Sequence, residues 1–181
     1  LEKTPKNALR IPFLLRIFHD AQFIFLWRDP RENVSSIMEA WRAGRWVTYP
    51  DLPGWEGPWS LLLPPTWQDL KGALLGTIAA QQWLRTNQTA LDDLQQLPAE
   101  RWASVAFDDF VANPAATVQR LCQFMDVPFD SALQARTAAP LPPSRYTHTA
   151  PAADKWRNNA ADIEPEMGTL AACWQRLRAL R

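Results

Sequence analysis

The alternation of predicted strands and helices along the chain indicates an α/β fold in which helices flank a parallel sheet. A strand, a turn and a helix follow one another twice, first over residues 23–44 and again over residues 101–127. Residues 23–27, FIFLW, are apolar at every position, which is typical of a strand covered on both faces. With 181 residues, 47% of them hydrophobic and 21% charged, the chain is predicted to form one domain over residues 1–181.

The helix after the first strand has clear start and stop signals. Asp29 is its predicted N-cap, Pro30 its first residue and Gly44 its end. A shorter helix is expected to precede the strand, within residues 7–20, where apolar residues recur at helical spacing.

The rest of the chain is predicted in the same way. Residues 45–66 are crowded with Pro, Gly and Trp, which favours a long loop held by aromatic packing. Residues 67–97 read as one long helix or two joined helices. In the second unit a strand leads to a helix capped by Asn113. Residues 139–163 show little periodicity, and a terminal helix is predicted over residues 163–180.

Charge and cysteine content exclude several classes of function. Lys plus Arg and Asp plus Glu number 19 each, so we expect neither a nucleic acid nor a membrane surface as partner. No apolar run approaches the roughly 18 residues of a membrane span. Cys122 and Cys173 lie far apart without a CxxC motif, which argues against a disulfide framework and a metal site. Because residue 1 is leucine and no signal-peptide pattern is present, we expect the natural start to lie upstream.

Arg28 directly follows the first strand, and Ser36 lies eight residues later on the predicted helix. In an open parallel sheet, ligands collect at the carboxyl ends of the strands, beside helix N-termini. A guanidinium and a hydroxyl there would suit a phosphate monoester. The alternative is that Arg28 pairs with Asp29 or another carboxylate, and that Ser36 merely lies on the helix.

Three segments, in this order, resemble the sulfotransferases that use 3′-phosphoadenosine 5′-phosphosulfate (PAPS). Residues 2–36 are similar to the middle of bacterial sulfotransferase-family proteins and, more distantly, of tyrosylprotein sulfotransferases. Residues 105–130 resemble the family's Tyr-Glu-Asp-Leu strand and the following helix, and residues 154–159, DKWRNN, resemble its Lys-Trp element. The resemblance implies a P-loop-like three-layer fold with a central parallel sheet, of which this chain is the C-terminal portion.

The same resemblance implies a cytoplasmic, bacterial enzyme that transfers a sulfuryl group from PAPS, its co-substrate, to a hydroxyl or amine. The acceptor would be a small molecule, a carbohydrate or a peptide. In the family's scheme a base removes the acceptor proton while lysine, serine and backbone donors stabilise the departing phosphate, and no metal is required.

For the nucleotide, the resemblance assigns Arg28 and Ser36 to the 3′-phosphate. Lys155 and Trp156 resemble the element that closes over the nucleotide, and Arg157 is a further phosphate donor. The alternative for Trp156 is that it anchors its loop to the core.

For catalysis, the resemblance assigns Lys3 and Ser144. Lys3 would face the bridging oxygen and the sulfuryl group, and the Ser144 hydroxyl would meet the nucleotide phosphates. Tyr146, two residues after Ser144, would stack on adenine, a contact worth roughly 1–3 kcal/mol. Otherwise Lys3 is an ordinary solvated lysine and Tyr146 covers a proline-rich loop.

The sequence also departs from the family pattern. Phe107 stands where the family has a tyrosine that reaches adenine, and Pro5 stands where the cytosolic small-molecule enzymes have their histidine base. None of the six glycines forms a phosphate-binding loop, so the first βα unit, with the 5′-phosphosulfate loop and the base, is expected to be missing. We therefore expect activity only with an N-terminal segment, or a second chain, that completes the sheet. His19 and His148 are weaker candidates for the base.

Two questions stay open at this point. The Trp-rich stretch 46–67, with Trp55 and Trp59 flanking Gly57, would contact the acceptor or would pack entirely on its own domain. The alternative function is a non-catalytic nucleotide-binding or interaction module that retains only the 3′-phosphate half-site. A phosphoryl-transfer enzyme is disfavoured because the Walker lysine and the magnesium ligands are missing.

Overall fold

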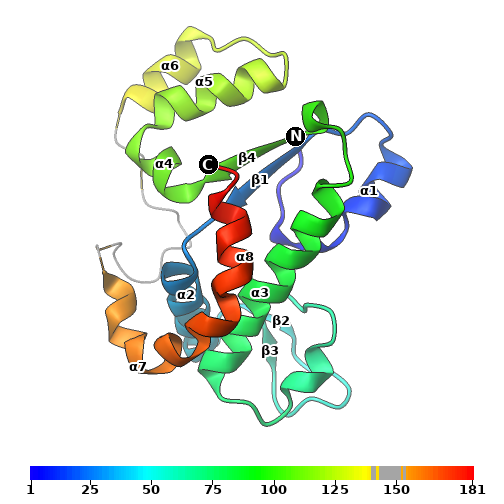
Figure 1. The fold of residues 1–181 in the computed structure, drawn as a ribbon, viewed down its shortest axis with the longest axis vertical. Coiled ribbons are helices and arrows are strands. Elements are labelled where there is room, and N and C mark those ends of the chain that lie inside the picture. Colours follow the sequence, from blue (N-terminus) through cyan, green and yellow to red (C-terminus); the bar gives the residue numbers. More distant parts are fainter. Residues whose placement is uncertain (140–141, 143–151, 153) are drawn as a thin grey trace.

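The computed structural model describes residues 1–139, 142, 152 and 154–181. Its centre is a parallel pair of strands, β1 (Phe23–Trp27) and β4 (Trp102–Ala106), in which Phe23 lies opposite Trp102 and Trp27 opposite Ala106 (Figure 1). Helices flank this pair, which confirms the predicted α/β class. The other elements are η1 (Pro5–Leu9), α1 (Ile11–Ile17), α2 (Pro30–Ala43), β2 (Val47–Tyr49), β3 (Trp59–Ser60), η2 (Trp67–Leu70), α3 (Leu75–Leu94), η3 (Ala99–Arg101), α4 (Phe107–Ala112), α5 (Pro114–Phe124), α6 (Ser131–Ala138), η4 (Lys155–Asn159), α7 (Ala160–Ile163), η5 (Glu164–Glu166) and α8 (Met167–Arg178).

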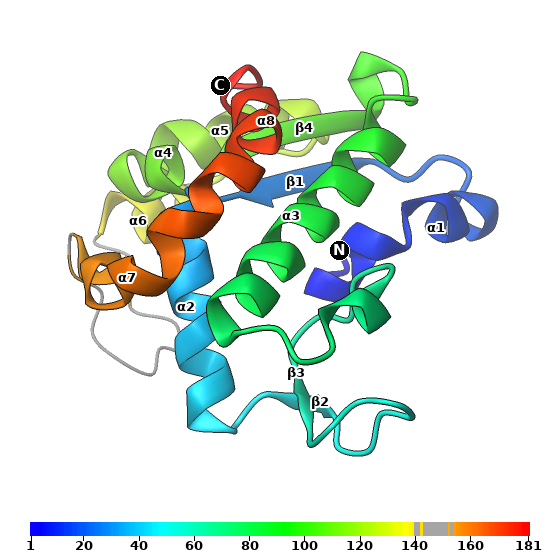
Figure 2. The same cartoon turned by 60° about the horizontal axis from the view of Figure 1, so that its bottom comes forward.

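One face of the strand pair is covered by α3 and α8, which cross it side by side (Figures 1 and 2). Trp27 packs edge-on against Trp174 of α8, with ring centres 5.6 Å apart, and Phe23 and Phe25 pack against α3. The opposite face is only partly covered. Ile24 is 37% exposed and Leu26 is 51% exposed. The expectation of a strand covered on both faces is therefore fulfilled on one face only within the described residues.

Helix α2 begins and ends where its capping residues predict. The Asp29 carboxylate accepts hydrogen bonds from the backbone N–H groups of Arg31 and Glu32, and Pro30 is the first helical residue. Gly44 ends the helix in the left-handed conformation, with φ of 61°, which favours glycine. Strand β1 thus passes directly into α2, and Arg28 lies at the junction.

Of the two alternatives predicted for residues 67–97, one long helix or two joined helices, the structure shows the divided form. A 3₁₀ turn, η2, comes first, and the chain then passes through Gly72, with φ of 74°, before α3 begins at Leu75. Gly76 lies inside α3, where an added Cβ would come 2.6 Å from the backbone oxygen of Asp162 in α7. Gly76 therefore allows α3 and α7 to pack closely, whereas Gly72 forms the turn before α3.

The Trp-rich segment packs as a cluster of four rings: Trp41, Trp55, Trp59 and Trp67. Their ring centres are 4.7–6.4 Å apart and most pairs meet edge to face. Trp59 is fully buried and its indole N–H donates to the Leu62 carbonyl. This confirms aromatic packing in this segment, although β2 and β3 also pair antiparallel within it, so it is not wholly a loop. Among the described residues, no helix has the length and apolar content needed to cross a bilayer.

Candidate functional site

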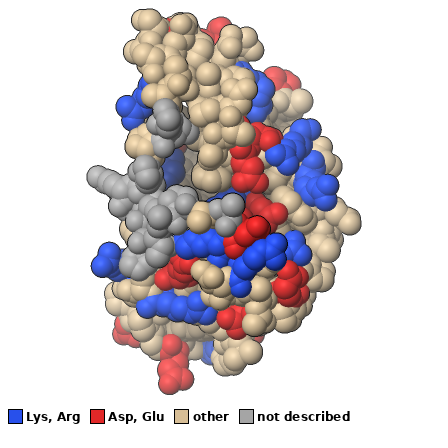
Figure 3. All heavy atoms as spheres, turned by 90° about the vertical axis from the view of Figure 1, so that its left-hand side faces the viewer, with Lys and Arg blue, Asp and Glu red and all other residues tan. Residues whose placement is uncertain are grey.

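A hollow of about 540 Å³ lies at the carboxyl ends of β1 and β4. Arg28 comes from the end of β1, Asp108 from the start of α4, and Trp156 from η4, so three distant parts of the sequence meet there. The face that α2, α4 and α7 share carries intermixed acidic and basic side chains (Figure 3). The lining residues are Arg28, Asp29, Arg31, Glu32, Asp108, Val111, Ala152 and Trp156.

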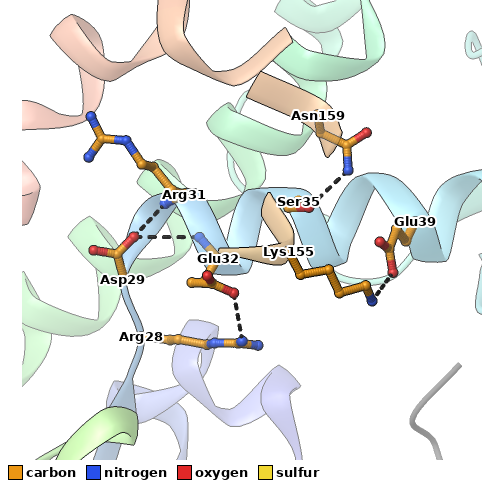
Figure 4. Close-up of polar contacts among 8 residues, drawn as sticks. All are labelled: Arg28, Asp29, Arg31, Glu32, Ser35, Glu39, Lys155 and Asn159. Carbon is orange, nitrogen blue, oxygen red and sulfur yellow. Dashed lines mark hydrogen bonds and ion pairs between the residues drawn. The ribbon is translucent and has the colours of Figure 1, made fainter. Parts of the chain in front are cut away.

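Arg28 has a carboxylate partner in this hollow. Its Nη2 lies 3.2 Å from Oε2 of Glu32 (Figure 4). Its guanidinium carbon lies 4.9 Å from the centre of the Phe107 ring. The Arg28 Nε is buried and has no hydrogen-bond partner within the described residues. The alternative expectation, that Arg28 pairs with a carboxylate, is therefore confirmed. The partner is Glu32 rather than Asp29. The Nε–H donor of the guanidinium is therefore unused in the part of the chain that the structure describes.

The environment raises the pKa of Glu32. Partial burial is the largest cause, and the negative charges of Asp29, Asp108 and Asp154 add to it, while Arg28 acts in the opposite direction. The hollow is lined by two guanidinium groups and three carboxylates. Glu32 therefore competes with any anionic ligand for Arg28.

Ser36 and Ser35 are placed differently on α2. Ser36 is exposed and lies on the same helical face as Glu32 and Glu39, since these positions are spaced i, i+4 and i+7. Ser35 is buried, and its Oγ accepts a hydrogen bond from Nδ2 of Asn159, 2.8 Å away (Figure 4). The predicted residue, Ser36, thus shares a face with the Arg28 partner, while its neighbour is engaged in packing.

The Lys-Trp element lies against α2. Lys155 forms an ion pair with Glu39 at 2.8 Å. Trp156 is half-buried, and the guanidinium carbons of Arg31 and Arg157 lie 5.3 and 5.1 Å from the centre of its ring. The structure therefore brings Trp156 to the hollow that Arg28 lines and Lys155 to the helix that follows Arg28.

Arg157 and Arg31 differ in how firmly they are held. Arg157 is exposed and approaches Asp154 at 3.5 Å. Arg31 donates two hydrogen bonds to the Glu164 carboxylate, of 3.1 and 3.4 Å, and the pKa of Arg31 is raised chiefly by this bond. Arg157 is consequently the less firmly held of the two cations beside Trp156.

Lys3, by contrast, does not line this hollow. Lys3 is exposed, and no hydrogen bond or ion pair joins it to another described residue. Ser144, Tyr146 and His148 lie outside the described residues. The described part of the chain holds no group of three or more His, Cys, Asp or Glu side chains that could bind a metal ion.

Sequence reasoning missed Arg31, Glu32 and Asp108 as lining residues. Arg31 and Glu32 lie in the first turn of α2, directly after the Asp29 cap, so their place beside Arg28 could have been inferred from the capping signal. Asp108 could not, because its position depends on how β4 pairs with β1.

A second hollow, of about 350 Å³, lies in the Trp-rich region and is lined by Gly54, Trp55, Glu56, Lys71, Gly72, Ala73 and Ile78. Trp55 is half-buried and reaches this hollow, whereas Trp59 is fully buried in the cluster. Of the two tryptophans expected to contact an acceptor, Trp59 therefore serves packing, and Trp55 retains an accessible face.

The chain is similar to known proteins in both sequence and structure. A family model described as the sulfotransferase family matches residues 1–131. Among solved structures, the sulfotransferase domain from the curacin biosynthetic pathway is similar, with 25% sequence identity and a TM-score of 0.52 over 73% of this chain. The match covers 40% of that domain, so this chain spans less than half of its length. No curated protein matches the chain.

Proposed function

Because the chain belongs to the sulfotransferase family, we propose that it forms part of an enzyme that transfers a sulfuryl group from PAPS to a hydroxyl or amine. The observation that carries this proposal is the position of Arg28, at the end of β1 in a hollow of about 540 Å³. This volume suits part of a nucleotide. When bound, PAPS supplies the sulfuryl group and departs as the bisphosphate.

Arg28 and Ser36 are proposed to hold the 3′-phosphate. The unused Nε of Arg28 shows that the guanidinium has donor capacity beyond its pair with Glu32. A phosphate that accepts from Arg28 would displace the Glu32 carboxylate, and Ser36 lies one helical turn beyond Glu32. Arg157, whose ion pair with Asp154 is exposed and therefore weak, is free to turn toward the same phosphate.

Trp156 and Lys155 are proposed to cover the nucleotide. Trp156 already lines the hollow and is flanked by two guanidinium groups, which favour an anionic ligand beside the ring. Tyr146 is the proposed stacking partner of adenine. Phe107 packs on Arg28 and would help to orient that guanidinium rather than bind the base.

Lys3 and Ser144 are the proposed catalytic donors, which would stabilise charge on the departing phosphate. No glycine lines the described hollow, which supports the proposal that the loop for the 5′-phosphosulfate comes from further polypeptide. The exposed side chains of Ile24 and Leu26, together with a strand pair of only two described strands, support a partner that adds to β1. We propose that an N-terminal segment, or a second chain, completes the sheet in this way.

The acceptor is proposed to be a small molecule, a carbohydrate or a peptide, and the enzyme is proposed to act in the cytoplasm. Trp55, at the second hollow, is the described aromatic residue best placed to meet such an acceptor.

Titration calorimetry with adenosine 3′,5′-bisphosphate, the expected product, tests the proposal. The chain should bind it with a micromolar dissociation constant, and Arg28→Ala should abolish binding. Arg16→Ala, which removes an exposed guanidinium from α1, is the matched control and should bind as the parent does. Absence of binding to the folded parent, or equal binding by Arg28→Ala, would contradict the proposed 3′-phosphate site.

The alternative is a non-catalytic module that binds the nucleotide through the 3′-phosphate half-site alone. It is favoured by the absence of a glycine-rich loop in the sequence. A sulfuryl-transfer assay on a longer protein that contains this chain decides between the two. Turnover supports the enzyme, and nucleotide binding without turnover supports the module.

A further inference from the structure

We propose that Asn159 is a positioning residue that fixes η4, and with it Trp156 and Lys155, on helix α2. This inference rests on the proposed function, and it adds a role that neither the sequence motifs nor the family match assigns. Its partner on α2 is Ser35, the neighbour of the proposed phosphate ligand Ser36.

Both ends of the Asn159 amide bind α2. Nδ2 donates to Oγ of Ser35 at 2.8 Å, and Oδ1 accepts from Nη1 of Arg42. Asn159 is 5% exposed and Ser35 is 3% exposed. Because a buried polar group left without a partner is strongly unfavourable, these bonds hold Asn159 in one place.

The geometry of η4 and α2 links the position of Asn159 to that of Trp156. In a 3₁₀ helix, residues three apart lie on the same side, so Trp156 and Asn159 present one face of η4. On α2, Arg31 and Ser35 are four residues apart and also share a face. Arg31 lies under the Trp156 ring and Ser35 under Asn159, so the two helices meet at two successive points.

The ion pairs around this contact are more exposed. Lys155 and Glu39, which also join η4 to α2, have side chains that are 23% exposed each. The pairs that join α2 to the segments after η4, Arg31–Glu164 and Arg42–Asp162, have side chains that are 34–49% exposed. Exposed ion pairs contribute little and are screened by salt. The buried Asn159–Ser35 bond is therefore the contact that sets where Trp156 sits in the hollow.

Two single variants test the inference, with two readouts. Asn159→Ala and Ser35→Ala should each speed hydrogen–deuterium exchange of backbone amides in residues 155–163. Each should also weaken binding of adenosine 3′,5′-bisphosphate by about tenfold, as for other residues that orient a binding group. The double variant should bind no more weakly than Asn159→Ala, because Asn159→Ala already removes the bond to Ser35. Ser36→Ala is the matched control for the exchange readout and should leave exchange in residues 155–163 as in the parent.

A double-mutant cycle of Asn159 and Trp156 tests whether Asn159 affects nucleotide binding through the Trp156 ring. In the Trp156→Ala background, Asn159→Ala should have little further effect on nucleotide binding. Ser35→Ala leaves the Asn159–Arg42 bond in place, so it serves as the test if Asn159→Ala fails to fold.

The outcomes separate this inference from the proposed function. If the parent binds the bisphosphate and both variants bind it equally well, the positioning role is wrong. Faster exchange without weaker binding also overturns it, since the bond would then serve stability alone. If the folded parent does not bind the bisphosphate, the proposed function fails and this inference fails with it.

Discussion

Arg28, the last residue before the α2 cap, and Glu32, in the first turn of α2, form an ion pair with Nη2 and Oε2 3.2 Å apart at the hollow. Because of this pair, the Glu32 carboxylate competes with an anionic ligand for the Arg28 guanidinium. Two further carboxylates line the same hollow, so the charge of a bound phosphate would meet repulsion as well as attraction. The affinity of the site therefore depends on how readily Glu32 gives up Arg28.

Removing the Glu32 charge should strengthen nucleotide binding. Glu32→Gln leaves the side chain almost unchanged in size but frees Arg28 and removes a like charge near the phosphate. We expect about fivefold tighter binding of adenosine 3′,5′-bisphosphate, from roughly 1 kcal/mol of lost repulsion. Calorimetry at neutral pH measures this. Glu100→Gln, an exposed change before the amino end of β4, is the control and should not alter binding. Weaker binding by Glu32→Gln would show that Glu32 orients Arg28 instead of competing for it.

Glu32 should also make stability depend on pH. Its pKa is raised in the folded state, mainly by burial, so the folded chain binds this proton more tightly than the unfolded chain does. The resulting stability is complete below the ordinary value of 4.5 and is lost as pH rises through the raised pKa. Urea unfolding of the parent and of Glu32→Gln, below and well above that range, should show the variant gaining stability relative to the parent as pH rises. The opposite trend would mean that the pair with Arg28 outweighs burial.

Several of these features could be predicted from the sequence, and others could not. The bounds of α2 follow from Asp29, Pro30 and Gly44, because capping is a local interaction. Which of Ser35 and Ser36 is buried depends on Asn159, which is far away in the sequence and packs on the face of α2 that Ser35 occupies. Local patterns carry no information about that partner.

The same limit applies to the strand and the long helix. An apolar run such as residues 23–27 predicts a buried strand, but exposure of Ile24 and Leu26 depends on which chain segments cover them. The break before α3 follows from Gly72 adopting φ of 74°, a conformation that glycine permits and the apolar periodicity does not reveal.

Gly76 and Gly168 should respond in opposite directions to alanine. At Gly76 an added Cβ would come 2.6 Å from the Asp162 carbonyl oxygen, so Gly76→Ala must push α7 away from α3. We expect a loss of about 1–3 kcal/mol in the free energy of unfolding. Gly168 is helical and has nothing within 4 Å of an added Cβ, so Gly168→Ala should be neutral or stabilise by roughly 0.5 kcal/mol. Urea unfolding compares the two, and equal effects would contradict the close α3–α7 contact.

The tryptophan cluster should be sensitive at its centre and tolerant at its edge. Trp59→Ala removes a fully buried ring and its hydrogen bond to Leu62, and we expect a loss of about 3–5 kcal/mol in the free energy of unfolding. Trp55→Ala removes a half-buried ring that lines the second hollow and should cost clearly less. Chemical unfolding monitored by circular dichroism measures both. A larger loss for Trp55 than for Trp59 would reverse the proposed division between packing and acceptor contact.

The uncovered face of β1 should make the chain associate. Ile24 and Leu26 are 37% and 51% exposed, and within the described residues β1 pairs with β4 alone, so an apolar strand edge and face meet solvent together. We expect the chain to bind a hydrophobic dye and to self-associate as its concentration rises. Leu26→Lys should reduce both effects, because a charge on this face opposes its burial. Leu74→Lys is the matched control, since Leu74 is 78% exposed just before α3 and lies away from the strand pair. Light scattering across a concentration series measures the association. A chain that stays monomeric and binds no dye would show that this face needs no partner, and the proposal that further polypeptide completes the sheet at β1 would then be abandoned.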